Sequence, residues 1–237
     1  MLMDPDPPLE LERARARAGT PSEPIIRVLG GKPRLRGIPD VVAVLAFVPL
    51  AAWLMASTAQ GAATVAATIY GLSVILLFGV SATYHTPMWS RSIRDLWRRL
   101  DHSMIFVATA ATYTPPCLLL LDAERGTRWL IITWSVAALG VLKCLLWPSA
   151  PRVLNTTLYI GFGWMALPLV GDFWTHGGPW FVGLVVLGGV VYSVGGVVYA
   201  RRWPNPWPAT FGYHEVFHLF VVAAAACHFA AMTLILL

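Results

Sequence analysis

The sequence predicts an all-α integral membrane protein, a bundle of seven transmembrane helices. Of its 237 residues, 57% are apolar and only 12% are charged, and the mean hydropathy is +0.64. Such a composition is typical of membrane proteins rather than of water-soluble domains. A membrane-spanning helix needs about 20 apolar residues, so seven spans use about 140 residues. The remainder suffices for a tail and loops, but not for a second folded domain.

The chain is expected to divide at residue 40, between a tail of residues 1–39 and a membrane domain of residues 40–237. Three of the first eight residues are prolines, and an Arg-x-Arg-x-Arg run follows at residues 13–17. A polar, proline-rich and basic segment of this kind is expected to be disordered or only partly helical. A cleaved signal peptide is not expected, because the first apolar stretch begins only near Val41.

Seven apolar stretches follow the tail, and each is long enough to cross a bilayer as a helix. They lie at about residues 41–57, 63–84, 102–121, 128–147, 153–174, 180–200 and 212–237.

Three of these stretches contain features that affect helix shape or packing. Prolines at Pro115, Pro116 and Pro168 are expected to kink the third and fifth spans. In the sixth span, Gly189 and Ser193 lie four residues apart within a run of small residues, so a neighbouring helix can approach closely.

The distribution of lysine and arginine predicts the orientation. In the seven-span arrangement, 15 of the 17 basic residues fall on the side of the N-terminus, and only Arg125 and Arg128 fall on the other side. The positive-inside rule therefore places the N-terminus in the cytoplasm and the C-terminus outside. The net charge of +5 results from 17 Lys and Arg against 12 Asp and Glu, and by itself it indicates no particular partner. No nucleic-acid partner is expected, and the expected partners are membrane lipids around a multi-pass protein of the cell membrane.

The three cysteines do not predict a disulfide or a thiolate metal site. Cys117, Cys144 and Cys227 all lie within apolar stretches and share no CxxC or CxxxC spacing. We expect them to be free, packed thiols.

Histidines at the ends of the predicted spans are the most informative residues. His85 closes the second span, with Ser81 one helical turn before it. His214 and His218 open the seventh span and, four residues apart, share one helix face. Asp101 and His102 open the third span. The predicted topology places all three segments at the cytoplasmic edge, and therefore at one membrane depth.

Each of these residues has an ordinary interpretation when it is taken alone. An interfacial histidine is usually a polar residue at headgroup level, Ser81 can bond back to the preceding turn, and Asp101 can be a helix N-cap. Taken together, two imidazoles four residues apart, a third at the same depth and a nearby carboxylate form a catalytic type of zinc site. The pattern therefore predicts Zn²⁺ bound by His85, His214 and His218, near Asp101.

The remaining polar residues fit this site less well. HEVFH is formally the HExxH motif, in which Glu215 would be a general base, but that motif is short and occurs by chance. His228 lies ten residues beyond His218, about 15 Å deeper by helical rise, and is expected to be a core or cavity residue. His176 falls in an outer loop. Asp101 and His102 point about 100° apart on a helix, so only one of them is expected to face the site.

Three motifs in register with the spans resemble those of the hemolysin III family, within the progestin and adipoQ receptor superfamily, which includes the adiponectin receptors. The resemblance covers roughly residues 40–237. The motifs, in chain order, are SxxxH at Ser81 and His85, LDH with TYTP at Leu100–His102 and Thr112–Pro115, and HxxxH at His214 and His218.

The resemblance implies a seven-helix bundle with zinc held by His85, His214 and His218. In that family pattern Asp101 would bind or orient the water at the metal, and Ser81 would lie just outside the metal ligands. The similar alkaline ceramidases hydrolyse a lipid amide, whereas the hemolysin name implies pore formation.

The leading hypothesis is a zinc-dependent hydrolase of a lipid amide or ester, with Asp101 as the residue that transfers the proton and Ser81 beside it. Two alternatives remain open, each with a structural zinc: a pore-forming cytolytic protein and a signalling receptor.

Overall fold

The computed structural model describes residues 32–58 and 60–237, and the regular elements within these ranges are helices. This confirms the predicted all-α class. The long helices are α3 (Ile38–Ser57), α4 (Ala62–His85), α5 (Arg91–Leu119), α6 (Ala123–Leu146), α7 (Arg152–Trp164), α9 (Gly178–Arg201) and α10 (Tyr213–Leu236). Between α7 and α9 lie a 3₁₀ turn (Leu167–Leu169), the short α8 (Val170–Asp172) and a π-helical turn (Phe173–Gly177).

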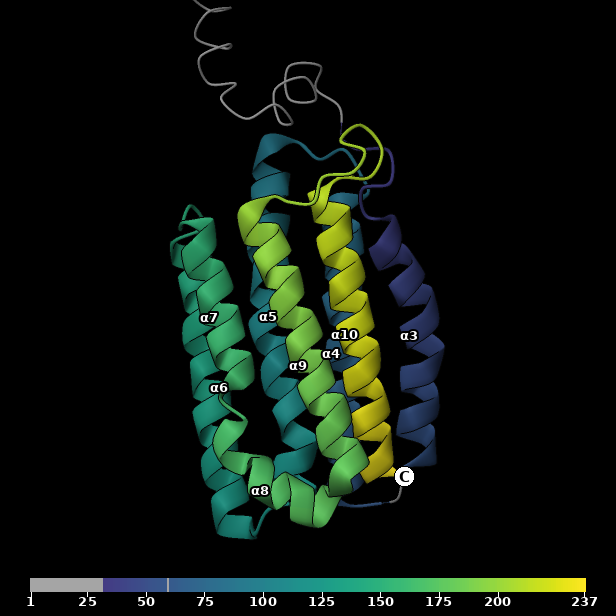
Figure 1. Ribbon diagram of the computed structural model, residues 1–237, viewed down its shortest axis with the longest axis vertical. Coiled ribbons are helices and arrows are strands. Elements are labelled where there is room, and N and C mark those ends of the chain that lie inside the picture. The colour runs from purple at the N-terminus through teal and green to yellow at the C-terminus, as the bar shows by residue number, and fades with distance from the viewer. Residues whose placement is uncertain (1–31, 59) are drawn as a thin grey trace, which may run out of the picture.

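The helices run up and down in a single bundle (Figure 1). We call the end at which α4 ends and α10 begins the histidine end, and the end that carries α8 and the C-terminus the α8 end. The helices α3 to α6 pack against one another in sequence order, α7 packs on α9, and α9 packs on α10. The last helix, α10, also contacts α3, α4 and α5. The position of α10 brings the last histidine segment against the first two long helices.

Five helical segments of the described chain are long and apolar enough to cross a membrane. They are α3, α4, α6, α10 and the run Arg152–Arg201. That run of 50 residues is not one straight helix: it folds back on itself, so that α7 and α9 pack side by side (Figure 1). Their contact is close: the Trp164 indole N–H donates to Ser193 Oγ at 2.9 Å. The protein is therefore a multi-pass membrane protein.

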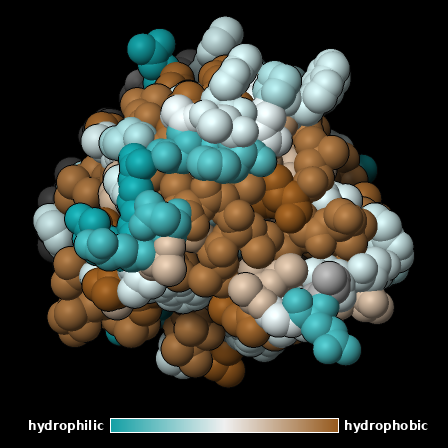
Figure 2. Space-filling view, turned by 90° about the horizontal axis from the view of Figure 1, so that it is seen from below, coloured by the Kyte–Doolittle hydropathy of each residue, from teal (hydrophilic) through white to brown (hydrophobic). Residues whose placement is uncertain are grey.

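The outer surface of the bundle matches this conclusion. Large apolar side chains such as Leu45, Ile131 and Leu139 are exposed on the helix faces. Figure 2 shows that hydrophobic residues also cover much of the α8 end, broken by small hydrophilic groups. The three cysteines are free thiols, as predicted.

The helix α5 starts earlier than the apolar pattern predicted. It begins at Arg91, and Ser90 occupies the N-cap position, because the basic turns that precede the apolar part are helical but too polar to register as a span. Its first turns project beyond the neighbouring helices (Figure 1). Asp101 therefore lies inside α5, and its interpretation as an N-cap is wrong.

The predicted span 153–174 is interrupted rather than kinked. The α-helix ends at Trp164, and Pro168 lies within the 3₁₀ turn that follows. Proline lacks the N–H of an α-helical hydrogen bond and clashes with the preceding turn, which explains the break. By contrast, α5 continues through Pro115 and Pro116.

The small residues of α9 are used for packing, as expected. A Cβ atom on Gly188 would lie 2.5 Å from the His228 ring, and one on Gly195 would lie 2.7 Å from Phe220 Cβ. These two glycines therefore let α9 lie directly against α10. On the other side of α10, Phe229 packs on Phe47, which stacks on Phe78 with ring centroids 5.3 Å apart.

Candidate metal centre

The start of α3 lies directly against the end of α4. Gly37 precedes α3 with a φ of +84°, and a Cβ atom there would come within 2.7 Å of Thr86 Oγ1 and 3.1 Å of His85 Cβ. A residue with a side chain would force the two segments apart. A positive φ is also unfavourable for residues other than glycine. Gly37 therefore allows the first helix to begin beside His85.

Residues 32–37 are bonded to the ends of both α4 and α10. Lys32 Nζ donates to the carbonyl oxygens of His85 at 3.0 Å and Pro87 at 2.7 Å, so it satisfies carbonyl groups left open at the end of α4. Burial, and then the nearby Arg94, lower the pKa of Lys32. Arg36 forms an ion pair with Glu215 in the first turn of α10.

Glu215 has two structural contacts that explain why it is buried. Its carboxylate accepts a hydrogen bond from the backbone N–H of Gly212 at 2.7 Å, as the capping box of α10, and also pairs with Arg36. Both contacts hold the start of α10 in place. Glu215 thus acts as a cap in a segment that matches the HExxH pattern.

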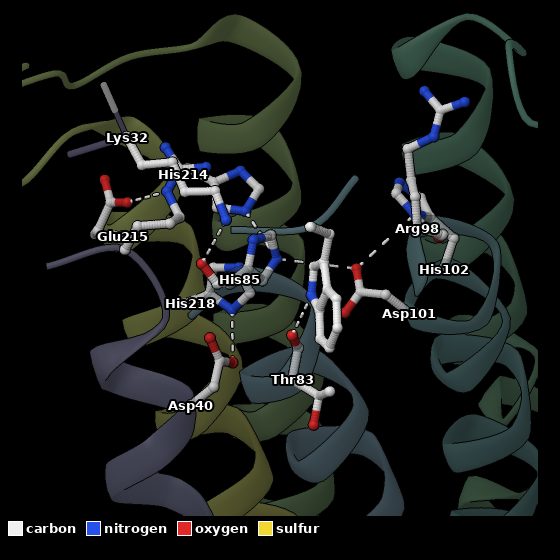
Figure 3. Close-up of polar contacts among 12 residues, drawn as sticks. Lys32, Asp40, Thr83, His85, Arg98, Asp101, His102, His214, Glu215 and His218 are labelled. Atoms are coloured by element: carbon white, nitrogen blue, oxygen red, sulfur yellow. Dashed lines mark hydrogen bonds and ion pairs between the residues drawn. The ribbon is translucent and has the colours of Figure 1, made fainter. Parts of the chain in front are cut away.

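The three histidines predicted as metal ligands come together at this end of the bundle (Figure 3). One possible ligand atom from each of His85, His214 and His218 lies within 4.8 Å of the other two. The Nε2 atoms of His85 and His214 are 3.3 Å apart. His85 and His218 are buried, and His214 is partly buried.

One pair of the imidazole nitrogens has the separation expected at a tetrahedral metal ion. Two nitrogens bound at about 2.0–2.1 Å to one tetrahedral zinc lie about 3.3–3.4 Å apart, which matches the separation of the two Nε2 atoms. In addition, His218 Nε2 is buried without a hydrogen-bond partner among residues 32–58 and 60–237. A metal ion could supply the partner of this nitrogen, since imidazole is a preferred ligand of zinc.

Asp101 lies beside the histidines without touching them. Its Oδ2 atom is 4.0 Å from His85 Nε2 and 3.8 Å from His102 Nδ1, too far for a direct hydrogen bond. Both Asp101 and His102 line the cavity described below. The His102 ring nitrogen Nδ1 lies 2.7 Å from the Arg98 carbonyl oxygen of the preceding turn.

Ser81 lies one turn before His85 on α4 and lines the same cavity. Its Oγ atom is buried and makes no hydrogen bond within the part of the chain that the structure describes. The hydroxyl group is therefore available to a ligand in the cavity or to the Asp101 carboxylate, which lines the same cavity.

The other two histidines lie outside the cluster. His176 is exposed in the π-helical turn at the α8 end, where its ring nitrogen Nδ1 lies 3.2 Å from the Asp172 carbonyl oxygen. His228 lines the cavity deeper in the bundle, as expected for a core or cavity residue. Its Nε2 atom lies 3.2 Å from the Val185 carbonyl oxygen, and its ring packs against Tyr192.

A long cavity of about 820 Å³ extends from the histidines into the bundle. Lys32 and Arg36 line its polar end, and Phe173 and Phe181 line its far end. On α10 its lining residues run from Tyr213 to Met232, a separation of 19 residues, or about 29 Å by helical rise. This is close to the thickness of the hydrocarbon core, about 30 Å.

One acidic residue of the cluster, Asp40, is not among the candidates that the sequence pattern predicts. Asp40, in the first turn of α3, is 1% exposed, and its Oδ1 atom lies 2.8 Å from His218 Nδ1. An acidic residue at the start of an apolar stretch is usually interfacial, so the pattern alone gave it no special weight. A signal was present, since an Asp at a span boundary shares the predicted depth of the histidines.

The fold and the site define a class of protein: a multi-pass helical membrane protein with a buried trihistidine group that can bind a metal. The chain belongs to the Haemolysin-III related family, whose model matches residues 32–229. It lies within the progestin and adipoQ receptor superfamily, as its motifs predicted.

Three relatives illustrate this membership. The chain is 32% identical to Hemolysin-3 of Bacillus cereus over 171 residues, which cover 70% of this chain and 73% of the relative. It is 31% identical to the Hemolysin-3 homolog of Bacillus subtilis (strain 168) over 162 residues, covering 68% and 73%. It is 28% identical to the Heptahelical transmembrane protein ADIPOR2 of Oryza sativa subsp. japonica over 185 residues, covering 71% and 80%.

Proposed function

We propose that this protein is a seven-span membrane hydrolase that uses zinc at His85, His214 and His218 to cleave an amide or ester bond of a lipid. The observation that carries the proposal is the placement of three convergent imidazoles at the polar end of a long, mostly apolar cavity. A lipid tail can occupy the apolar part of the cavity while its polar linkage lies at the histidines.

The proposed seven crossings are α3, α4, α5, α6, the arm from α7 to the π-helical turn, α9 and α10. The segments rich in lysine and arginine then share the histidine end, which we assign to the cytoplasm by the positive-inside rule. In support, α7 and α9 run side by side in Figure 1, and one relative is named a heptahelical transmembrane protein.

Labelling of single introduced cysteines tests this topology. A cysteine placed in the N-terminal tail should react with an impermeant reagent only from the cytoplasmic side, and one appended after Leu237 only from outside. The native cysteines are replaced first, so that the signal is specific. Finding both ends on one side would contradict the seven crossings.

Zinc, when bound by the three histidines, supplies Lewis-acid polarisation of a carbonyl group and activation of water. Asp101, which lines the same cavity, accepts a proton from the attacking water and passes it to the leaving amine or alcohol. In this reaction a C–O bond forms, the C–N or ester C–O bond breaks, and one water molecule is consumed. In the proposed reaction the Ser81 hydroxyl group, which has no other hydrogen-bond partner among the described residues, donates a hydrogen bond that orients the Asp101 carboxylate.

A chelator-dependent hydrolysis assay tests the proposal. Purified protein is incubated with a long-chain lipid amide and with the matched ester, and release of fatty acid is measured. Release should stop when a chelator removes the metal and return when zinc is added. A His218→Ala variant is the control for contaminating hydrolases. Release that is equal in this variant and in the wild type would contradict the proposal.

The names of the two Bacillus relatives support a second candidate function, a cytolytic protein in which zinc is structural. This alternative predicts leakage of dye from liposomes at low protein-to-lipid ratios, without release of fatty acid. The wild-type protein should cause no such leakage if the hydrolase proposal is correct.

A further inference from the structure

We propose that Asp40 is a positioning residue of the trihistidine centre: it fixes the tautomer of His218, so that the Nε2 lone pair is available to a metal ion. This inference rests on the metal site proposed above, and it adds a fourth segment, the start of α3, to a site otherwise formed by α4, α5 and α10. Figure 3 shows Asp40 below His218, joined to it by a dashed line, and Asp101 to the right, beyond His85.

The contact between Asp40 and His218 is short and buried. Asp40 Oδ1 lies 2.8 Å from His218 Nδ1, and the two side chains are 1% and 8% exposed. A carboxylate only accepts hydrogen bonds, so Nδ1 must carry the hydrogen. In a neutral imidazole the other nitrogen, Nε2, then holds a lone pair and can bind a metal.

The second polar atom of each of these two side chains is consistent with this role. His218 Nε2 is buried without a hydrogen-bond partner among the described residues, and Asp40 Oδ2 is in the same situation. Burying an unpaired polar atom is unfavourable. A cation bound at Nε2 gives this nitrogen a partner. It also attracts the Asp40 carboxylate through the imidazole, in the carboxylate–histidine–metal arrangement that is common around zinc.

The chain before α3 holds Asp40 in this position. Gly37 allows α3 to start against His85, and Arg36 pairs with Glu215, three residues before His218. The backbone N–H groups of Arg34 and Leu35 donate to Ala209 and Thr210 at 3.2 and 3.0 Å. The segment that precedes Asp40 is thus fixed to the segment that precedes His218.

The experiment compares zinc affinity among the wild-type protein, Asp40→Asn, Asp40→Ala and the matched control Asp95→Asn. Asp95 lies on α5 at the same end of the bundle, and its side chain is 54% exposed. Zinc affinity is measured by competition with a chelator on the detergent-purified protein, and thermal unfolding is measured with and without zinc.

Asp40→Asn should weaken zinc binding about 10- to 100-fold, the usual effect of removing a hydrogen-bond partner of a ligand. The amide group of Asn can donate to His218 Nδ1 and shift the hydrogen to Nε2, as occurs when a carboxylate that orients a histidine is replaced by an amide. Asp40→Ala should weaken binding similarly, and Asp95→Asn should not. The unfolding temperature of the zinc-free protein should stay near that of the wild type, while stabilisation by zinc decreases.

Two results would overturn the inference. Equal zinc affinity in the wild type and both Asp40 variants would show that Asp40 does not position His218. Loss of the folded state in the zinc-free Asp40 variants would show that Asp40 is a structural residue, needed whether or not metal is present. Failure of the wild-type protein to bind zinc would instead contradict the metal site itself, so the two failures are distinguishable.

A tautomer measurement provides a second readout. Nitrogen-15 shifts of histidine-labelled, zinc-free protein, with His218 assigned by its absence from a His218→Gln spectrum, should show the Nδ1–H form in the wild type. Asp40→Asn should raise the population of the Nε2–H form. An unchanged tautomer would contradict the inference even if the variant binds zinc weakly.

Discussion

The ion pairs that join separate segments at the histidine end of the bundle are more deeply buried than the pair of Arg125 and Asp172 at the α8 end, whose side chains are 40% and 24% exposed. At the histidine end, Arg36 and Glu215, which are 179 residues apart, form an ion pair, and His85 meets His214, which is 129 residues away. At the α8 end, Arg128 pairs with Glu124 four residues earlier on the same helix, and the two side chains are 67% and 82% exposed.

The difference shows which polar groups need an explanation beyond stability. An exposed pair on one helix contributes at most about 1 kcal/mol and remains solvated if it breaks. Buried imidazoles and carboxylates lose solvation when they are removed from water. Convergence of such groups from three separate helices is expected at a functional site within a membrane protein. The contrast between the two ends is therefore the basis for assigning the site.

The largest expected effect follows from removing a ligand. His85→Ala, His214→Ala and His218→Ala should each reduce zinc affinity by more than the roughly 100-fold expected for loss of an outer partner. Each should also lower the unfolding temperature in the presence of zinc, because metal binding contributes to folding. Metal analysis after gel filtration and a thermal unfolding curve measure the two effects.

The matched control is His176→Ala at the α8 end, which should change neither zinc content nor unfolding temperature. If His176→Ala and His218→Ala lost zinc to the same extent, the histidines at the two ends would not differ in function.

The second largest effect should separate catalysis from metal binding. Asp101→Asn keeps the shape of the side chain but removes the proton acceptor, so the rate of lipid hydrolysis should decrease about 10²- to 10⁴-fold. Zinc content should remain near the wild-type value. Asp95→Asn, on the exposed part of α5, is the control. Hydrolysis by Asp101→Asn at the wild-type rate would rule out its role in proton transfer.

The three metal-ligand candidates could be predicted from sequence because topology alone determines their depth. A helix that ends at His85 and one that begins at Tyr213 must meet the membrane surface on the same side when the helices alternate in direction. The four-residue spacing then places His214 and His218 on the same face of α10. No tertiary contact had to be known for this prediction.

Other features could not be predicted because they depend on packing between segments. The contact between Asp40 and His218 requires the close approach at Gly37, which the pattern of apolar residues does not encode. The start of α5 was missed because a hydropathy pattern detects the apolar part of a helix and not its basic extension. The capping function of Glu215 depends on Arg36 and on the turn at Gly212.

A smaller effect is expected for the buried ion pair at the histidine end. Arg36→Gln leaves the Glu215 carboxylate buried without its cation, which should lower the free energy of unfolding by about 1–3 kcal/mol. This is below the 3–5 kcal/mol typical of fully buried pairs, because the Arg36 side chain is 21% exposed. Chemical denaturation of the zinc-free protein measures the effect. No change in stability would mean that this pair does not hold α3 to α10.

The smallest effect is expected for the exposed pair at the α8 end. Arg128→Gln should change the free energy of unfolding by less than about 0.5 kcal/mol, because both partners of this pair are solvated. The same denaturation experiment measures it beside Arg36→Gln. Equal destabilisation by the two variants would remove the energetic contrast between the ends of the bundle.

The most direct test of the central claim is the zinc content of the purified wild-type protein. We expect about one zinc per chain, as for a site with three histidine ligands, removed by a chelator and restored when zinc is added. The same measurement on a variant that lacks all three histidines should give no bound zinc. A wild-type protein that binds no zinc after this treatment, or that binds it equally well without His85, His214 and His218, would contradict the account.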